Sequence, residues 1–176
     1  MRVPASLILM FGALGICGAM ANDPAGANAS GREIFARLEK LTGSWSGTTS
    51  SGKTQHVSYR TTATGSVLVE TWTLGAGRES MTLYALDGDR LLATHYCPQG
   101  NQPRLAYTGT DAQGRAQFRF VDGTNLHVPG SSHQQAFWIR FDGEREFSRG
   151  ETYVENDTAA DTLEDSEAVH YTRRAE

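Results

Sequence analysis

From residue 43 onward the chain is a succession of short runs in which apolar and polar residues alternate, separated by glycine, aspartate and serine. Alternation with a period of two is typical of half-buried β-strands, and Asp-Gly pairs between two such runs are typical of hairpin turns. The clearest hairpin is LYALDGDRLLATHY, in which two β-type runs flank Asp87 and Gly88. The pattern predicts strands at residues 44–49, 54–62, 66–74, 79–86, 90–97, 103–109, 115–121, 134–141, 145–154 and 167–173.

About ten consecutive strands with short connections predict an all-β fold, an up-and-down antiparallel β-barrel, because closing the sheet removes its exposed edges. An open sheet or a sandwich is the alternative. Residues 157–166 are acidic and polar, which predicts a solvated loop before the last strand. Neither an internal repeat nor a second domain is visible in the sequence.

One short helix is predicted ahead of the barrel. Ser30 and Glu33 have the spacing of a capping box, in which each side chain pairs with the backbone of the other residue. Four apolar residues follow at helical spacing, namely Ile34, Phe35, Leu38 and Leu41. The helix should end near residues 42–43 and cover part of the sheet with its apolar stripe.

The N-terminus predicts export. Arg2 precedes an apolar run at residues 7–16, and Ala19 and Ala21 are small residues at the two positions that a signal peptidase reads. The run is too short to span a membrane, which takes about 20 apolar residues. Residues 1–21 are therefore expected to be a signal peptide, residues 22–29 a flexible leader and residues 30–176 a single domain, periplasmic or secreted and not inserted in a membrane. Lipidation of Cys17 is the less favoured alternative, because Ile16 is large where a lipoprotein cleavage box takes a small residue.

Composition limits the chemistry of the mature domain. With 16 basic and 20 acidic residues and no long block of one charge, the chain lacks the basic stripe of a nucleic-acid-binding protein. After the predicted cleavage Cys97 is the remaining cysteine, so an intramolecular disulfide cannot form. Oligomeric state does not follow from these features.

Glu70 stands out among the predicted strands. In VLVETW, Leu68, Glu70 and Trp72 share one face, and the opposite face is also largely apolar. A buried carboxylate must be paired or protonated, and Arg104 is the partner that we expect. An exposed Glu70 at the barrel rim is the alternative.

The segment THYCPQGNQPRL, residues 94–105, concentrates the candidate chemistry. His95 and Cys97 share a face of the predicted strand, where a third ligand, His133 or His127, could complete a zinc or copper site. A Cys97 nucleophile with His95 or His133 as its base is the enzymatic alternative. The structural alternative makes Cys97 a small buried residue that precedes a turn.

The second half of that segment, Asn101, Gln102 and Arg104, is unusually polar for a turn and favours a rim that faces a pocket. Arg104 would then be the anchor for an anionic group. Aromatic residues of later strands, such as Phe118 and Phe137, would form apolar walls. In the last strand, Val169 and Tyr171 are expected to point inward, which turns His170 to solvent.

Several segments resemble a family of exported bacterial proteins that look like calycin-type β-barrels, distant relatives of lipocalins, fatty-acid-binding proteins and nitrobindins. The segments are LTGSWSGT, VLVETW, MTLYALDGDRLLATHYCPQGNQPRL and FRFVDGTNL, together with His133, and they extend over essentially the whole mature chain. The resemblance implies a barrel and carries no activity. The Gly-x-Trp-x-Gly element around Trp45 is also similar to nitrobindin-type haem barrels, in which a histidine near the C-terminal strand holds the iron; His170 is the residue in a comparable place.

Together these patterns predict an exported barrel that binds a small, largely apolar molecule with a polar or anionic group. No catalytic residue is assigned, and a non-enzymatic role is favoured. Haem binding, a thiol- or metal-dependent enzyme built on His95, Cys97 and His133, and a filled barrel that binds other proteins are the alternatives. The candidate ligand-contacting residues are Trp45, Glu70, Trp72, His95, Cys97, Asn101, Gln102, Arg104 and His133.

Overall fold

The computed structural model describes residues 29–127, 129–155, 164–165 and 168–175. The predicted signal peptide at 1–21, nearly all of the leader at 22–29 and most of the loop predicted at 157–166 lie outside the described residues. Among the described residues, no helix is long and apolar enough to cross a membrane.

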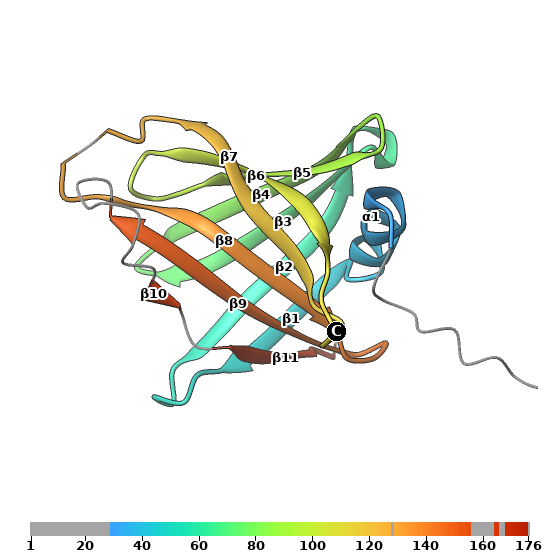
Figure 1. Cartoon of the computed structure of the whole chain (residues 1–176). Coiled ribbons are helices and arrows are strands. Elements are labelled where there is room, and N and C mark those ends of the chain that lie inside the picture. The colour runs from blue at the N-terminus through green and yellow to red at the C-terminus, as the bar shows by residue number, and fades with distance from the viewer. Residues whose placement is uncertain (1–28, 128, 156–163, 166–167, 176) are drawn as a thin grey trace, which may run out of the picture.

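The described chain is a short helix followed by β-strands in close succession (Figure 1). The elements are α1 (Gly31–Glu39), β1 (Gly43–Thr48), β2 (Thr54–Thr62), the 3₁₀ turn η1 (Ala63–Gly65), β3 (Val67–Gly75), β4 (Arg78–Asp87), β5 (Arg90–Tyr96), β6 (Gln102–Thr110), β7 (Ala116–Thr124), β8 (Ser132–Phe141), β9 (Glu146–Glu155), β10 (Glu164–Asp165) and β11 (Val169–Arg173). The predicted strands match these closely. Two differences stand out: β7 continues to Thr124 instead of stopping at residue 121, and the two-residue β10 falls within the loop predicted at 157–166.

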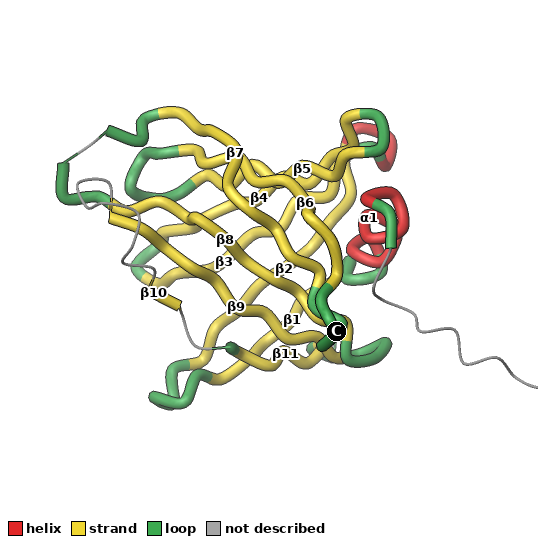
Figure 2. Tube along the Cα trace, in the orientation of Figure 1, coloured by secondary structure: helices red, strands yellow, loops and turns green. Residues whose placement is uncertain are grey.

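The sheet closes on itself, and the predicted all-β barrel is confirmed as a closed antiparallel barrel of ten strands. Each strand from β1 to β9 pairs with the next, β9 pairs with β11, and β11 pairs with β1. The two-residue β10 also pairs with β9, at Thr152 and Tyr153, beyond the residues of β9 that pair with β11. Figure 2 shows the strands wrapping around a common axis with short loops at either end.

The helix lies at one end of the barrel (Figure 1). Its predicted capping box is present, since the Ser30 backbone N–H donates to Glu33 Oε2 (2.6 Å) and the Glu33 backbone N–H donates to Ser30 Oγ (3.3 Å). Ile34 and Leu38 are fully buried against the strands. The apolar stripe of α1 therefore covers this end of the core.

Trp45 belongs to that covered end. It is fully buried, its indole N–H donates to the Leu41 carbonyl (2.6 Å), and its ring packs edge-on against Phe147. The guanidinium of Arg173 stacks on the same ring at 4.3 Å and donates to the carbonyls of Lys40 and Thr42. Trp45 is therefore a structural residue, because the connection between α1 and β1 folds over it.

Candidate functional site

The other end of the barrel contains a cavity of about 500 Å³. Its lining comes from strand ends remote from α1, such as Thr49 just after β1, Leu74 near the end of β3 and Ser132 at the start of β8. Exposed residues, including Arg78, Pro98 and Gln99, form the mouth. The deeper lining is made of Gln55, Trp72, Ser80, His95, Cys97, Arg149, Glu151, Tyr153, Val169 and Tyr171.

Strand β9 carries the central polar residues of this cavity. Phe147 is fully buried in the core and stacks on Tyr171 with ring centroids 4.8 Å apart. Because side chains of a strand alternate between its faces, the inward position of Phe147 also turns Arg149, Glu151 and Tyr153 into the barrel. All three line the cavity.

The guanidinium of Arg149 is almost completely enclosed, with 1 % of its side chain exposed. Nη1 donates to Glu70 Oε2 (3.0 Å) and to the Tyr84 hydroxyl (3.0 Å), and Nε donates to Glu151 Oε1 (2.8 Å). The plane of the group also lies 4.2 Å from the centre of the Phe137 ring. Nη2 is buried, and no atom of the described residues accepts a hydrogen bond from it.

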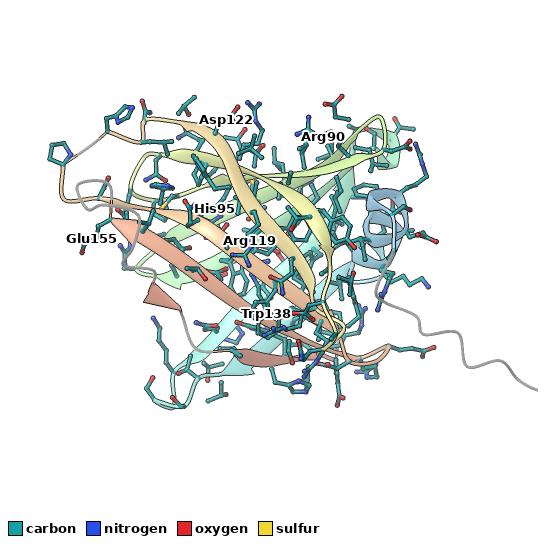
Figure 3. The ribbon with its side chains drawn as sticks, in the orientation of Figure 1. Arg90, His95, Arg119, Asp122, Trp138 and Glu155 are labelled. Carbon is teal, nitrogen blue, oxygen red and sulfur yellow. The ribbon has the colours of Figure 1, made fainter. Side chains whose placement is uncertain are left out.

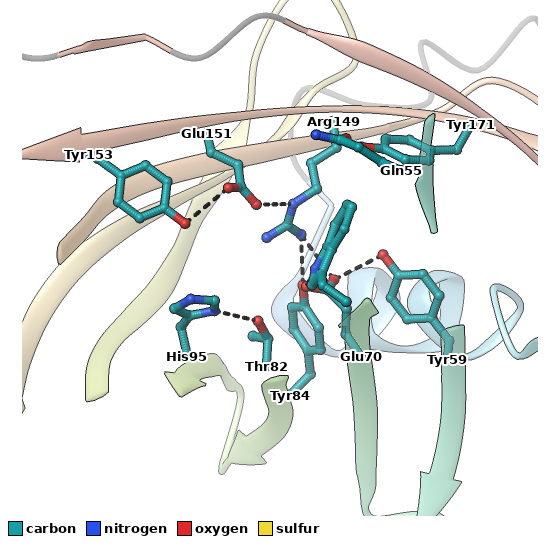
Figure 4. A network of polar contacts seen from close by, with 11 residues as sticks. Gln55, Tyr59, Glu70, Thr82, Tyr84, His95, Arg149, Glu151, Tyr153 and Tyr171 are labelled. Carbon is teal, nitrogen blue, oxygen red and sulfur yellow. Dashed lines mark hydrogen bonds and ion pairs between the residues drawn. The ribbon is translucent and has the colours of Figure 1, made fainter. Parts of the chain in front are cut away.

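Glu70 is completely buried, as one reading of the sequence expected, and four donors converge on it (Figure 4). Tyr59 Oη (2.9 Å) and Tyr84 Oη (2.7 Å) donate to Oε2, which also accepts from Arg149, and Trp72 Nε1 donates to Oε1 (2.6 Å). An ionised carboxylate can accept all four hydrogen bonds. This cluster holds the guanidinium of Arg149 in one position.

The expected pairing of Glu70 with Arg104 was wrong. Pro103 and Leu105, on either side of Arg104 in β6, are buried, so Arg104 points to the outside of the barrel. There its Nε donates to Asp122 Oδ1 (2.7 Å) on β7, and both side chains are about half-exposed. Figure 3 shows Asp122 at the outer edge of the ribbon and His95 among the side chains within it.

Charge and burial together set the protonation states around Arg149. Burial alone would raise the pKa of the Glu151 carboxyl. The net effect is a pKa below the ordinary value, because the charge of Arg149 lowers it most, followed by His95 and by the hydrogen bonds from Arg149 and Tyr153. Burial, reinforced by the charge of Glu70, raises the pKa of the Tyr59 and Tyr84 hydroxyls well above 10.0. Glu151 is therefore an anion at neutral pH, while both phenols keep the protons that they donate.

His95 and Cys97 both line the cavity, as their shared strand face predicted. The His95 ring is buried, with Nδ1 3.1 Å from the Thr82 hydroxyl, and burial lowers the pKa of the ring. Burial raises the pKa of the Cys97 thiol. A neutral imidazole and a protonated thiol are poor starting points for the thiolate chemistry of a cysteine enzyme.

The remaining candidates do not line this cavity. Asn101 is buried beneath the turn after β5, where its Nδ2 donates to the Ser132 carbonyl (2.8 Å). Gln102 lies beside Arg104 in a groove on the outer surface, and His133 packs against the Phe120 ring at 5.0 Å. The phase of β6 turns Gln102 outward, where its Nε2 donates to the Gly100 carbonyl (2.9 Å) and stabilises the turn. The bond from Asn101 to Ser132 instead ties this turn to the start of β8.

The ligand sets expected for a three-residue metal site and for haem held by His170 are not assembled among the described residues. No group of three or more His, Cys, Asp and Glu side chains in the described ranges could hold a metal ion. His170 points out of the barrel as predicted, and its Nδ1 lies 3.2 Å from Ser148 Oγ and 3.4 Å from Asp142 Oδ2. It therefore cannot ligate an iron inside the cavity.

The central residues of the site, Arg149 and Glu151 with the tyrosines around them, were missed in the sequence. A signal was present, since Phe147 is the first apolar residue of EFSRGETYVE and its phase turns Arg149, Glu151 and Tyr153 inward. Two charged residues on the inward face of a barrel strand would then have marked β9 as a polar wall.

Compared with protein-family models and with curated proteins, the sequence matches none of them. The likeness to calycin-type barrels stays a prediction.

Proposed function

We propose that this protein binds a small, largely apolar molecule in the open half of its barrel, with the polar group of the molecule against Arg149. The observation that carries the proposal is a buried guanidinium at the wall of a 500 Å³ cavity that has one nitrogen without an acceptor among the described residues. Cavities of about 300–1,000 Å³ with aromatic walls and a few placed polar groups are typical of small-molecule sites.

The energetics of Arg149 support a ligand. A buried donor without an acceptor costs about 1–3 kcal/mol, and more where the donor is charged. A bound molecule that offers an oxygen to Nη2 removes this cost, and its apolar body gains from contact with Trp72 and Tyr171, whose ring centroids lie 5.5 Å apart. The Glu70 cluster fixes the guanidinium in advance, so little conformational entropy is lost when the ligand binds.

The N-terminal pattern supports a place for this activity in the periplasm or outside the cell, and the resemblance to exported calycin-type barrels agrees with it. In this proposal the protein carries or senses its ligand and does not convert it. The protonated thiol of Cys97 favours a binding protein over a thiol enzyme.

Occupancy of the cavity can be tested with the neutral fluorescent probe N-phenyl-1-naphthylamine. The wild-type protein should bind it, and Cys97→Trp should abolish binding because the indole fills the cavity from its wall. Tyr96→Trp is the matched control, since the neighbouring side chain points outward and is 44 % exposed. Failure of the wild type to bind the probe, or equal binding by both variants, would refute the proposed site.

A further inference from the structure

The hydrogen bonds and charges around Arg149 define the chemical class of the ligand, an inference that rests on the proposed function. We propose that the cavity selects an uncharged molecule whose carbonyl-type oxygen accepts from Arg149 Nη2, and that it disfavours carboxylates.

The first argument is geometric. A guanidinium binds a carboxylate most strongly through two parallel N–H groups on one edge, either Nε with Nη2 or Nη1 with Nη2. In Arg149, Nε is bonded to Glu151 and Nη1 to Glu70 and Tyr84, so each edge has one nitrogen already engaged. Nη2 is left to bind an acceptor alone, which a single carbonyl oxygen can do, and the two-point geometry that favours a carboxylate is lost.

The second argument is the balance of charge. Arg149 contributes one positive charge and contacts two carboxylates, Glu70 at 3.0 Å and Glu151 at 2.8 Å. The depressed pKa of His95 keeps its ring neutral, so it adds no positive charge near neutral pH. The other arginine that lines the cavity, Arg78, is exposed at the mouth, where water screens its charge. A carboxylate ligand would therefore be the third anion around a single buried cation.

The third argument comes from the surroundings of Nη2. Figure 4 shows the unbonded guanidinium nitrogen of Arg149 on the side of Glu151, Tyr153 and His95, away from the Tyr59 hydroxyl. Tyr153 Oη donates to Glu151 Oε2 (3.1 Å), so this hydroxyl is already used as a donor and is not available to neutralise a second carboxylate. An uncharged oxygen satisfies Nη2 without repulsion from Glu151.

The test compares matched probes as competitors of N-phenyl-1-naphthylamine at pH 7. The probes are 2-naphthamide, its methyl ester analogue methyl 2-naphthoate, and the ionised acid 2-naphthoate. In the wild type the amide and the ester should displace the fluorescent probe at concentrations at least about tenfold lower than the acid, because Coulomb repulsion in a poorly solvated site disfavours the acid. In Glu151→Gln, which keeps the shape of the side chain and removes one anion, the ratio of acid to amide affinity should rise about tenfold.

Asp122→Asn is the matched control, because it removes one negative charge on the outer face, where Asp122 pairs with Arg104. It should leave the ratio of acid to amide affinity as in the wild type. An acid that competes as well as the amide in the wild type would overturn the inference and leave the proposed function standing. Absence of binding by the fluorescent probe would overturn both. An unchanged ratio in folded Glu151→Gln would reject the role of Glu151, and the wild-type comparison decides the ligand class even if that variant does not fold.

Discussion

Replacement of Glu70 by leucine removes the acceptor on which the buried cluster depends. Tyr59, Trp72 and Tyr84 each lose a partner at a buried site, and one unpaired neutral donor costs about 1 kcal/mol or more, so these three contribute about 3 kcal/mol. Breaking a buried ion pair costs about 3–5 kcal/mol when the remaining charge has no other partner. Arg149 keeps its ion pair with Glu151, so only part of that cost applies here. We therefore expect Glu70→Leu to lower the free energy of unfolding by about 3–5 kcal/mol.

Urea unfolding followed by tryptophan fluorescence measures this change. Glu70→Gln should fall between Glu70→Leu and the wild type, because the amide keeps one acceptor oxygen. Asp122→Ala breaks the half-exposed pair with Arg104 and should leave the free energy of unfolding nearly unchanged. If Glu70→Leu cost no more than Asp122→Ala, the cluster would not be a major source of stability and the reasoning would be refuted.

Three further predictions concern protonation, access and the helix. Burial lowers the pKa of His95 below its ordinary 6.5, so the unfolded chain binds a proton at this site more readily than the folded chain. The wild type should therefore lose more unfolding free energy than His95→Gln as the pH falls below 6.5; equal losses in urea titrations would contradict this. Burial raises the pKa of the Cys97 thiol, so iodoacetamide should react with it slowly at pH 7 and faster at higher pH. Bound N-phenyl-1-naphthylamine should slow the reaction further. A rate that the probe does not change would show that the probe binds elsewhere. Ser30→Ala should lower the free energy of unfolding by about 1 kcal/mol through loss of the capping box, while a change near zero would show that packing alone holds α1.

The elements and the closed barrel could be predicted because their determinants are local. Alternation in each strand and glycine or aspartate in each turn are visible within ten residues, and the capping box of α1 spans four. The strands then close because consecutive hairpins leave two edges that pair with each other. The outward direction of His170 followed from the same alternation.

The partner of Glu70 could not be predicted from such local patterns. Glu70 and Arg149 are 79 residues apart, on strands that the closed barrel places across its interior from one another. Arg104 lies in a polar segment and is closer to Glu70 in sequence than Arg149, but the buried Leu105 beside it fixes Arg104 on the outer face. Which arginine faces a buried carboxylate depends on barrel closure and strand phase together.

The most direct test of the account is a crystal structure of the protein with 2-naphthamide bound. We predict the naphthalene ring in the cavity beside Trp72 and the amide oxygen within hydrogen-bonding distance of Arg149 Nη2, with the bonds of Arg149 to Glu70 and Glu151 unchanged. A ligand bound outside the barrel, or an Nη2 that is bonded to another protein group in the complex, would contradict the account.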